Sequence, residues 1–147
     1  ELVEMGRAAA RKDHLLSCQE VLAAVGLEGY EQTPLSQISG GERRRAFIAM
    51  ILAQGGTTLL LDEPLAGLDL RYQYELLTLL RSLCQTHNLT VMISLHDLIL
   101  ARNLDRLLVI RQGQLLADGL PTDILTQQLV QQTFDLDPRF QVAGIGK

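Results

Sequence analysis

The sequence has 147 residues, which matches the usual length of about one domain. Hydrophobic residues make up 47% of it, which is ample for a folded core and excludes an intrinsically disordered chain. The formal net charge of -4 does not indicate a dominant nucleic-acid-binding surface, so we expect no nucleic acid among the partners.

No stretch of the sequence is long and apolar enough to span a bilayer, and Glu1 to Ala10 lacks the basic-then-apolar form of a secretion signal. We therefore expect a cytoplasmic protein that sits on a membrane partner. Cys18 and Cys84 lack metal-ligand spacing, and we expect both to be reduced. The sequence opens on Glu1 in what reads as the middle of a helix, so we expect that an upstream part is missing.

The first predicted helix runs from Lys12 to Val25, because apolar residues recur there at alternating three- and four-residue steps. Gly26 is expected to close this helix. The segment from Leu27 to Gln37 contains Gly29 and Pro34 and is predicted to be a loop.

A capping box follows this loop, because Ser39-Gly40-Gly41-Glu42 places Ser-x-x-Glu ahead of an apolar run. The two glycines leave the backbone uncovered, so a phosphate could approach the free N–H groups at the positive end of the helix. Arg43 to Arg45 crowd the same end, oppose the helix dipole and indicate an anion nearby. The alternative is an ordinary capped helix with a solvated arginine face. From Ala46 to Ala53 the helix is predicted to be buried on most of its circumference.

Thr58 to Leu61 is the short apolar run expected of a central parallel strand that is covered on both faces. Asp62 and Glu63 then fall at its carboxyl end, where open α/β sheets place their ligands. Asp62 suits a magnesium ion that also binds waters and phosphate oxygens. Glu63 could orient or deprotonate an attacking water. The alternative is an acidic turn that binds no ligand.

A tight loop from Ala66 to Asp69 leads into the next helix, which Asp69 is expected to cap. One face of this helix is predicted to pack against the sheet. That face consists of Tyr72, Leu76, Leu79, Leu80 and Leu83. The next strand is predicted from Leu89 to Leu95, and it delivers His96 to the edge that holds the two acids if the strands are parallel. A neutral imidazole there could contact a phosphate or an attacking water.

The elements predicted after His96 are shorter. They are, in order, a short helix at 97–103, a hairpin of strands 107–110 and 115–117 around Gln112-Gly113, a helical turn opened by Pro121, and a polar helix at 127–134. Gly144 to Lys147 looks like the beginning of a phosphate loop, but no Ser or Thr follows it.

Four of these segments, in this order, resemble motifs of the ATP-binding cassette (ABC) ATPases. Ile38 to Glu42 resembles the signature motif, which is usually LSGGQ, and Leu59 to Glu63 resembles the Walker B motif with its catalytic glutamate. Ala66 to Asp69 is similar to the D-loop, and His96 is similar to the switch histidine. One of these motifs alone has little specificity, whereas four in sequence are highly specific.

A finer resemblance concerns the branch of the family. Glu1 to Arg7, together with Asp69 to Gln73, is most similar to the importers that serve iron-siderophore, haem or cobalamin permeases. The hairpin and the segment from Ala117 to Leu125 also resemble a transporter subunit.

The resemblance implies an α/β fold, namely the C-terminal part of a RecA-like P-loop NTPase core with parallel strands and a C-terminal β-hairpin. This core part would be joined to part of the helical signature subdomain. Residues 1–56 would form the remnant of that subdomain with the signature helix, and residues 57–147 would form the C-terminal part of the ATPase core.

The resemblance also implies an ATP-binding subunit of an ABC importer that couples ATP hydrolysis to the uptake of a metal chelate. Its partners would be a second ATPase subunit in a head-to-tail dimer, an integral-membrane permease and, indirectly, a substrate-binding protein. The subunit would lie on the inner face of the cell membrane. The γ-phosphate held by one subunit would be contacted by four residues of the other, Ser39, Gly40, Gly41 and Glu42.

The remaining roles follow from the same resemblance. Asp62 would hold Mg²⁺ through water, and Glu63 would act on the attacking water. His96 would contact the γ-phosphate within its own subunit, and Asp69 would help to couple the two sites.

The sequence also departs from the family pattern. Ile38 and Glu42 replace the usual leucine and glutamine, and there is no G-x-x-x-x-G-K-[ST] phosphate loop, aromatic adenine-stacking loop or glutamine loop. We therefore expect that this polypeptide alone binds ATP weakly and does not hydrolyse it. We also expect the strand at Leu59 to Leu61 to be short of neighbours, with poor solubility or swapped dimers as the result. The alternatives are a non-transport ABC ATPase and a catalytically silent module that docks on a permease or on a full-length subunit.

Overall fold

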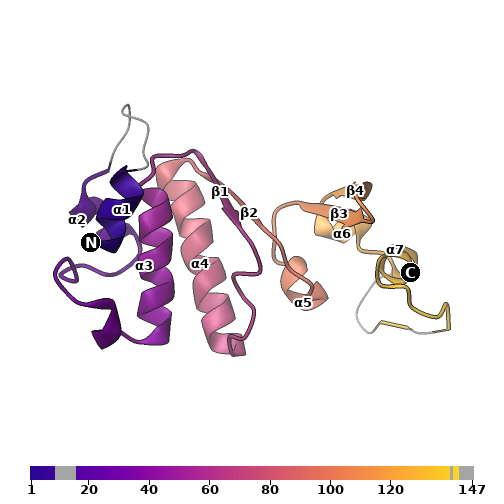
Figure 1. Ribbon diagram of the computed structural model, residues 1–147. Helices are drawn as coiled ribbons and strands as arrows, with labels where there is room; N and C mark the ends of the chain where they lie inside the picture. Colours follow the sequence, from indigo (N-terminus) through magenta and orange to yellow (C-terminus); the bar gives the residue numbers. More distant parts are fainter. Residues whose placement is uncertain (9–15, 140, 143–147) are drawn as a thin grey trace. The chain divides into compact units, whose positions relative to one another are not determined.

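The computed structural model of the chain describes residues 1–8, 16–139 and 141–142 (Figure 1). It forms two compact units, Glu1–Ser94 (unit 1) and Leu95–Lys147 (unit 2). The predicted division between residues 56 and 57 came from the family resemblance, and it stays a prediction. None of the described helices has the length and apolarity needed to cross a membrane.

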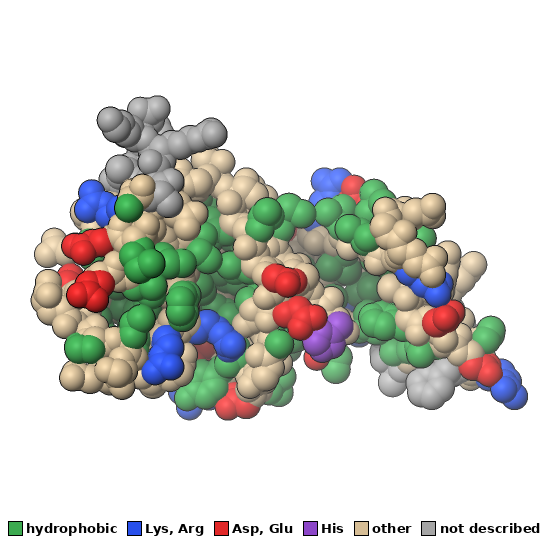
Figure 2. All heavy atoms as spheres, in the orientation of Figure 1, with side chains coloured by type: hydrophobic (Ala, Val, Ile, Leu, Met, Phe, Trp, Pro, Cys, Tyr) green, Lys and Arg blue, Asp and Glu red, His purple; other side chains and the backbone are tan. Residues whose placement is uncertain are grey.

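The first half of unit 1 is helical. It contains α1 (Leu2–Ala8), α2 (Cys18–Ala24), the 3-10 turn η1 (Leu35–Gln37) and α3 (Gly40–Leu52). Helices α1 and α2 both pack on α3, and hydrophobic side chains gather over these helices on the face shown in Figure 2. Gly6 is buried where α1 meets α3, and a Cβ built there would lie only 2.1 Å from the carbonyl oxygen of Met50. The two helix backbones therefore approach each other closely at Gly6.

Helix α2 begins later than the periodicity predicts. The prediction placed its start at Lys12, whereas the structure starts it at Cys18; residues 12–15 lie outside the described residues. The reason is a capping box, in which the Ser17 hydroxyl accepts the N–H of Glu20 at 3.2 Å and the Glu20 carboxylate accepts the N–H of Ser17 at 2.7 Å. Gly26 has a φ of 69° and follows the end of the helix, as predicted.

Two parallel strands complete unit 1. Strand β1 (Thr58–Leu61) pairs with β2 (Thr90–Ile93), with Thr58 opposite Thr90 and Leu61 opposite Ile93. Helix α4 (Leu70–His87) connects them. The parallel pairing is confirmed, although β2 is shorter than the predicted strand from Leu89 to Leu95.

The prediction that β1 is covered on both faces is wrong for the described chain. Leu59 is 1% exposed, whereas Leu60 is 71% exposed and its partner across the ladder, Met92, is 45% exposed. Side chains alternate between the two faces of a strand, so one face of the pair is buried and the other is open. Within unit 1, the packing layer that includes α4 lies on the buried face of the pair.

Helix α4 packs through three leucines of the predicted face, Leu76, Leu80 and Leu83. Tyr72 was also assigned to that face, but its side chain is exposed. Its ring lies beside the start of α3 instead, because a Cβ built at Gly41 would be 3.8 Å from Cε1 of Tyr72. Both cysteines lie in helices, as predicted, and their thiols are free.

Unit 2 is built around a β-hairpin. Its elements are α5 (Leu98–Ala101), β3 (Leu107–Arg111), β4 (Gln114–Gly119), α6 (Pro121–Ile124) and α7 (Gln127–Phe134). Strands β3 and β4 are antiparallel, and the turn between them has φ values of 51° at Gln112 and 75° at Gly113, as the hairpin prediction requires. One buried hydrophobic cluster of this unit consists of Ala101, Leu107, Leu125 and Val130.

Candidate active site

The turn that opens α3 is a complete capping box, as predicted. The Ser39 hydroxyl accepts the N–H of Glu42 at 3.2 Å, and Oε2 of Glu42 accepts the N–H of Ser39 at 2.7 Å. Ser39 has the extended backbone of an N-cap residue, with φ -63° and ψ 165°. Two free donors of the first turn are thereby satisfied within the chain.

The second carboxylate oxygen of Glu42 is also occupied. Oε1 accepts a hydrogen bond from the Tyr30 hydroxyl, with 2.7 Å between the two oxygens. The N–H of Ser39, then the Tyr30 and Ser39 hydroxyls, lower the pKa of Glu42 to about 2, and the same contact with Glu42 raises the pKa of Tyr30. Glu42 is therefore a fixed anion at the start of α3. No local pattern marks Tyr30, which lies in the loop after α2 and reaches Glu42 only through the tertiary fold.

The glycines of this turn leave its backbone accessible. A Cβ built at Gly40 would meet nothing within 4 Å, and the nearest atom to one built at Gly41 would be Cε1 of Tyr72 at 3.8 Å. A large anionic group could therefore approach these N–H groups. One of the three neighbouring arginines has an internal contact, because Arg43 donates to the carbonyl of Leu35 at 3.1 Å. Contact of this turn with a partner's nucleotide stays a prediction.

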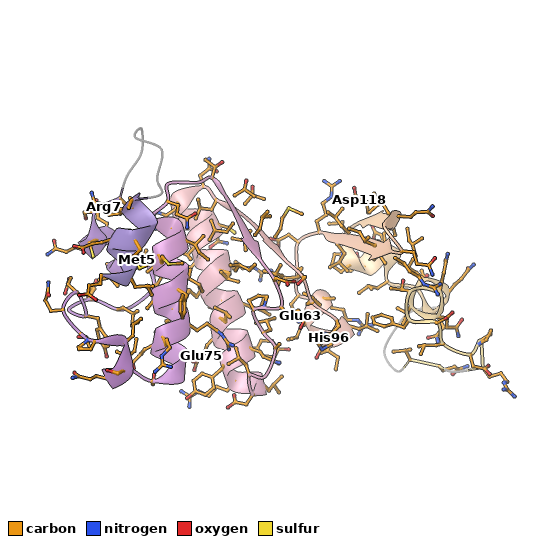
Figure 3. All side chains as sticks on the ribbon, in the orientation of Figure 1. Met5, Arg7, Glu63, Glu75, His96 and Asp118 are labelled. Carbon is orange, nitrogen blue, oxygen red and sulfur yellow. The ribbon has the colours of Figure 1, made fainter. Side chains whose placement is uncertain are left out.

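Asp62 and Glu63 lie directly after β1, at the carboxyl end of the parallel pair, and both side chains are exposed. Figure 3 labels Glu63, the second of these two acids. Ser94, which follows β2, joins them. Its Oγ donates to Oδ1 of Asp62 at 2.6 Å and accepts the N–H of Glu63 at 2.7 Å. The predicted placement of the two acids at a strand end is confirmed, and a hydroxyl that the sequence did not single out connects them.

Glu63 has an unusual backbone. Its φ is 42°, in the left-handed region that non-glycine residues seldom adopt, and Pro64 follows it. Its carbonyl accepts the N–H of Ala66 at 3.1 Å, so the residue opens a tight turn. Such a conformation costs about 1–3 kcal/mol and persists when surrounding contacts hold it. Glu63 is therefore held in place through its backbone as well as through the strand before it.

Asp69 and His96 complete the set of predicted site residues. Asp69 caps α4 as predicted, since its Oδ1 accepts the N–H of Tyr72 at 3.1 Å. His96 has an exposed side chain and precedes Asp97, the N-cap of α5, in unit 2. Its approach to Glu63, which belongs to unit 1, stays a prediction from the sequence.

A capped Gly-Gly turn and a parallel strand that ends in two acids thus occur in one compact unit. Comparison with known proteins agrees with this arrangement, since a family profile described as "ABC transporter" matches residues 4–66, which include both features. The petrobactin import ATP-binding protein FpuC of Bacillus anthracis is 39% identical, over 93% of this chain and 53% of its own length. The chain belongs to the ABC transporter ATPases.

Two further comparisons support membership in the ABC family. The hemin import ATP-binding protein HmuV of Rhodopseudomonas palustris is 37% identical, over 99% of this chain and 57% of its own. A solved structure described as "An inward-facing conformation of a putative metal-chelate type ABC transporter" has a TM-score of 0.77 at 26% identity, over 91% of this chain and 56% of that chain. The α/β fold predicted from the resemblance is therefore confirmed, and the chain spans about half the length of these relatives.

Membership in the ABC family implies nucleotide binding and, with it, magnesium. The described residues contain no group of three or more His, Cys, Asp and Glu side chains that could hold a metal ion. A magnesium ion that takes one carboxylate and fills its other positions with water and phosphate oxygens needs no such group. Asp62 fits this requirement, because its carboxylate is exposed and its Oδ1 is oriented by Ser94.

Proposed function

We propose that this chain is part of an ATP-binding subunit of an ABC importer, which couples ATP hydrolysis to the uptake of a metal chelate such as an iron-siderophore, haem or cobalamin. The importer role rests on the relatives, which are named for petrobactin and hemin import. The main structural support is the strand end at which Ser94 joins Asp62 and Glu63.

The chemistry of these residues suggests their roles. Asp62 would hold a magnesium ion, which would neutralise charge on the phosphate oxygens. Glu63 orients the attacking water or accepts its proton, an effect worth about a hundred- to ten-thousandfold in general-base catalysis. His96 contacts the γ-phosphate from the same subunit.

The signature turn acts on the other subunit of a head-to-tail dimer. In that dimer the N–H groups of Gly40 and Gly41 and the hydroxyl of Ser39 face the γ-phosphate held by the partner, and Asp69 couples the two sites. The exposed backbone at both glycines supports this assignment. Glu42 keeps the turn in shape, since both of its oxygens are engaged within the chain.

The subunit works on the cytoplasmic face of the membrane. Its direct partners are a second ATPase subunit and an integral-membrane permease, and a substrate-binding protein delivers the chelate to the permease. The importer relatives support these assignments.

The deciding experiment is ATP hydrolysis by the full-length protein with its permease. Glu63→Gln is expected to reduce turnover by at least about a hundredfold while ATP binding is retained, because the amide cannot accept the proton of water. Hydrolysis is measured by phosphate release, and binding by nucleotide titration. Glu28→Gln, which changes an exposed loop glutamate in the same way, serves as the matched control and should leave turnover unchanged.

The outcomes separate the candidate functions. Unchanged turnover in Glu63→Gln would remove Glu63 from its assigned role. Binding to a permease without any hydrolysis in the wild type would support the silent docking module instead. The 147-residue chain on its own is expected to bind ATP weakly and to show no turnover, so micromolar affinity with magnesium-dependent hydrolysis by the chain alone would contradict that expectation.

A further inference from the structure

Ser94 is attached to the end of β1 at three successive positions. Besides its two side-chain hydrogen bonds with Asp62 and Glu63, its backbone N–H donates to the carbonyl of Leu61 at 3.0 Å. A serine hydroxyl has one proton to donate, and here that proton goes to a carboxylate. The orientation of Oγ is therefore fixed while it accepts the N–H of Glu63.

The strand register explains why the side chain at position 94 contacts Asp62. Leu61 pairs with Ile93, so one further step along the two parallel strands places Asp62 opposite Ser94. Directly opposite side chains in a ladder point to the same face of the sheet and interact as a pair. A residue at 93 or 95 would point to the other face.

The left-handed backbone of Glu63 is the second observation. A φ of 42° turns the chain sharply after Asp62, and the N–H of Glu63 then lies 2.7 Å from Oγ of Ser94. Loss of this acceptor would leave the unusual conformation without one of the contacts that hold it. The orientation of one acid and the backbone of the next thus depend on the same hydroxyl.

We propose that Ser94 is a positioning residue for hydrolysis, which orients the carboxylate of Asp62 and fixes the backbone of Glu63. The inference rests on the proposed function, since it assumes that these two acids serve magnesium and the attacking water. One oxygen of Asp62 accepts a hydrogen bond from the Ser94 hydroxyl, and the carboxylate keeps further lone pairs for a hydrated magnesium ion. Ser94 itself does not touch the reacting atoms.

The test compares Ser94→Ala with Ser94→Thr in the full-length protein with its permease. Ser94→Ala is expected to lower kcat by about ten- to a hundredfold, the usual effect of losing a group that orients a metal-holding residue, and to raise the magnesium concentration needed for half-maximal rate. The KM for ATP should change little. Ser94→Thr keeps the hydroxyl and should restore most of the rate.

A matched control and a second readout make the test specific. Ser82→Ala removes an exposed serine hydroxyl from α4 and should leave all these parameters unchanged. In the full-length subunit without nucleotide, Ser94→Ala should speed the amide hydrogen exchange of Glu63, measured by NMR, because its N–H loses the acceptor. Ser94→Thr should keep the wild-type exchange rate.

The possible failures can be told apart. Wild-type kcat and magnesium dependence in a folded Ser94→Ala protein would overturn the inference, and so would a loss of rate that only follows the fraction of unfolded protein. A wild-type protein without magnesium-dependent hydrolysis contradicts the proposed function itself. A wild-type protein that hydrolyses ATP and loses the activity with Glu63→Gln, but not with Ser94→Ala, contradicts only the role of Ser94.

Discussion

At the scale of single residues, Glu42 differs from an ordinary capping glutamate because both of its oxygens accept hydrogen bonds. The contacts with Ser39 and Tyr30 favour its charged form and lower its pKa from the ordinary value of 4.5 to about 2. A carboxylate whose pKa is lower in the folded state stabilises the fold above its unfolded pKa. This contribution is complete above about pH 4.5 and is lost as the pH falls toward 2.

We predict that Glu42→Gln lowers the stability of the protein at neutral pH and removes part of its acid sensitivity. The free energies of unfolding of wild type and variant, measured with urea from pH 7 to pH 2, should differ most at neutral pH and converge as the pH falls through the window from 4.5 to about 2. The reason is that glutamine has no carboxylate charge to lose in this pH range.

Tyr30→Phe is the companion variant, because it keeps the carboxylate and removes one of its hydrogen bonds. The pH range over which its free energy of unfolding falls on acidification should be narrower than that of the wild type. A difference between wild type and Glu42→Gln that is the same at every pH would show that the capping box and Tyr30 do not favour the charged form of Glu42.

At the scale of elements, the contact of α1 with α3 depends on the absence of a side chain at Gly6. We predict that Gly6→Ala destabilises unit 1, because the new Cβ would lie 2.1 Å from the carbonyl oxygen of Met50, and overpacking costs about 1–3 kcal/mol or more before any gain in propensity. Alanine favours helices over glycine by only about 1 kcal/mol, so the clash should outweigh the gain in propensity. Urea unfolding measures the difference.

The control for Gly6→Ala is Gly56→Ala. A Cβ at Gly56 would be 3.6 Å from the carbonyl oxygen of Thr58, an ordinary contact, so this variant should change stability far less. Equal effects of the two substitutions, or a stabilised Gly6→Ala protein, would mean that α1 and α3 separate readily and that their close approach is not needed.

The elements also show how far local patterns predict this fold. Ser39-Gly40-Gly41-Glu42 predicted the start of α3 correctly, whereas the periodicity from Lys12 onward missed the start of α2, which the structure places at a Ser-x-x-Glu capping box at Ser17. The cap was the stronger physical signal, since it satisfies free backbone donors. The parallel pairing of β1 and β2 and the hairpin turn at Gln112-Gly113 followed from strand composition and turn chemistry.

The site was predicted less completely, for a physical reason. Asp62 and Glu63 could be placed because a strand leads directly to them. Tyr30 and Ser94 act across the fold, on residues 12 and 31–32 positions away, and no local rule links such pairs. A cross-strand register would have marked Ser94 as the neighbour of Asp62, but the register becomes known only with the structure.

At the scale of the whole molecule, the open face of the β1–β2 pair is the main departure from expectation. Parallel strands are normally buried on both faces, yet Leu60 and Met92 form an exposed apolar pair. The chain spans 53% of the length of one relative and 57% of another. We propose that further sequence of a full-length subunit covers this face, and that the 147-residue chain alone associates through it.

We predict that replacing both Leu60 and Met92 by threonine reduces self-association of this chain, measured by sedimentation at several concentrations. Threonine keeps the β-propensity of the strands and removes the apolar surface. The matched control is the double replacement of Ile110 and Leu115 by threonine, because these residues form an exposed cross-strand pair in the antiparallel hairpin of unit 2. Antiparallel sheets commonly have one solvated face, so this control should have little effect.

The same replacements in a full-length subunit should act in the opposite sense, since a covered face loses stability when apolar side chains are removed. We expect the Leu60 and Met92 double variant of the full-length subunit to unfold at a lower urea concentration than wild type. In the 147-residue chain, the same replacements should reduce self-association. Equal effects of the two double variants on self-association would show that exposed apolar area in general, and not the open parallel face, makes the chain associate. A full-length double variant as stable as wild type would mean that this face stays open in the whole subunit.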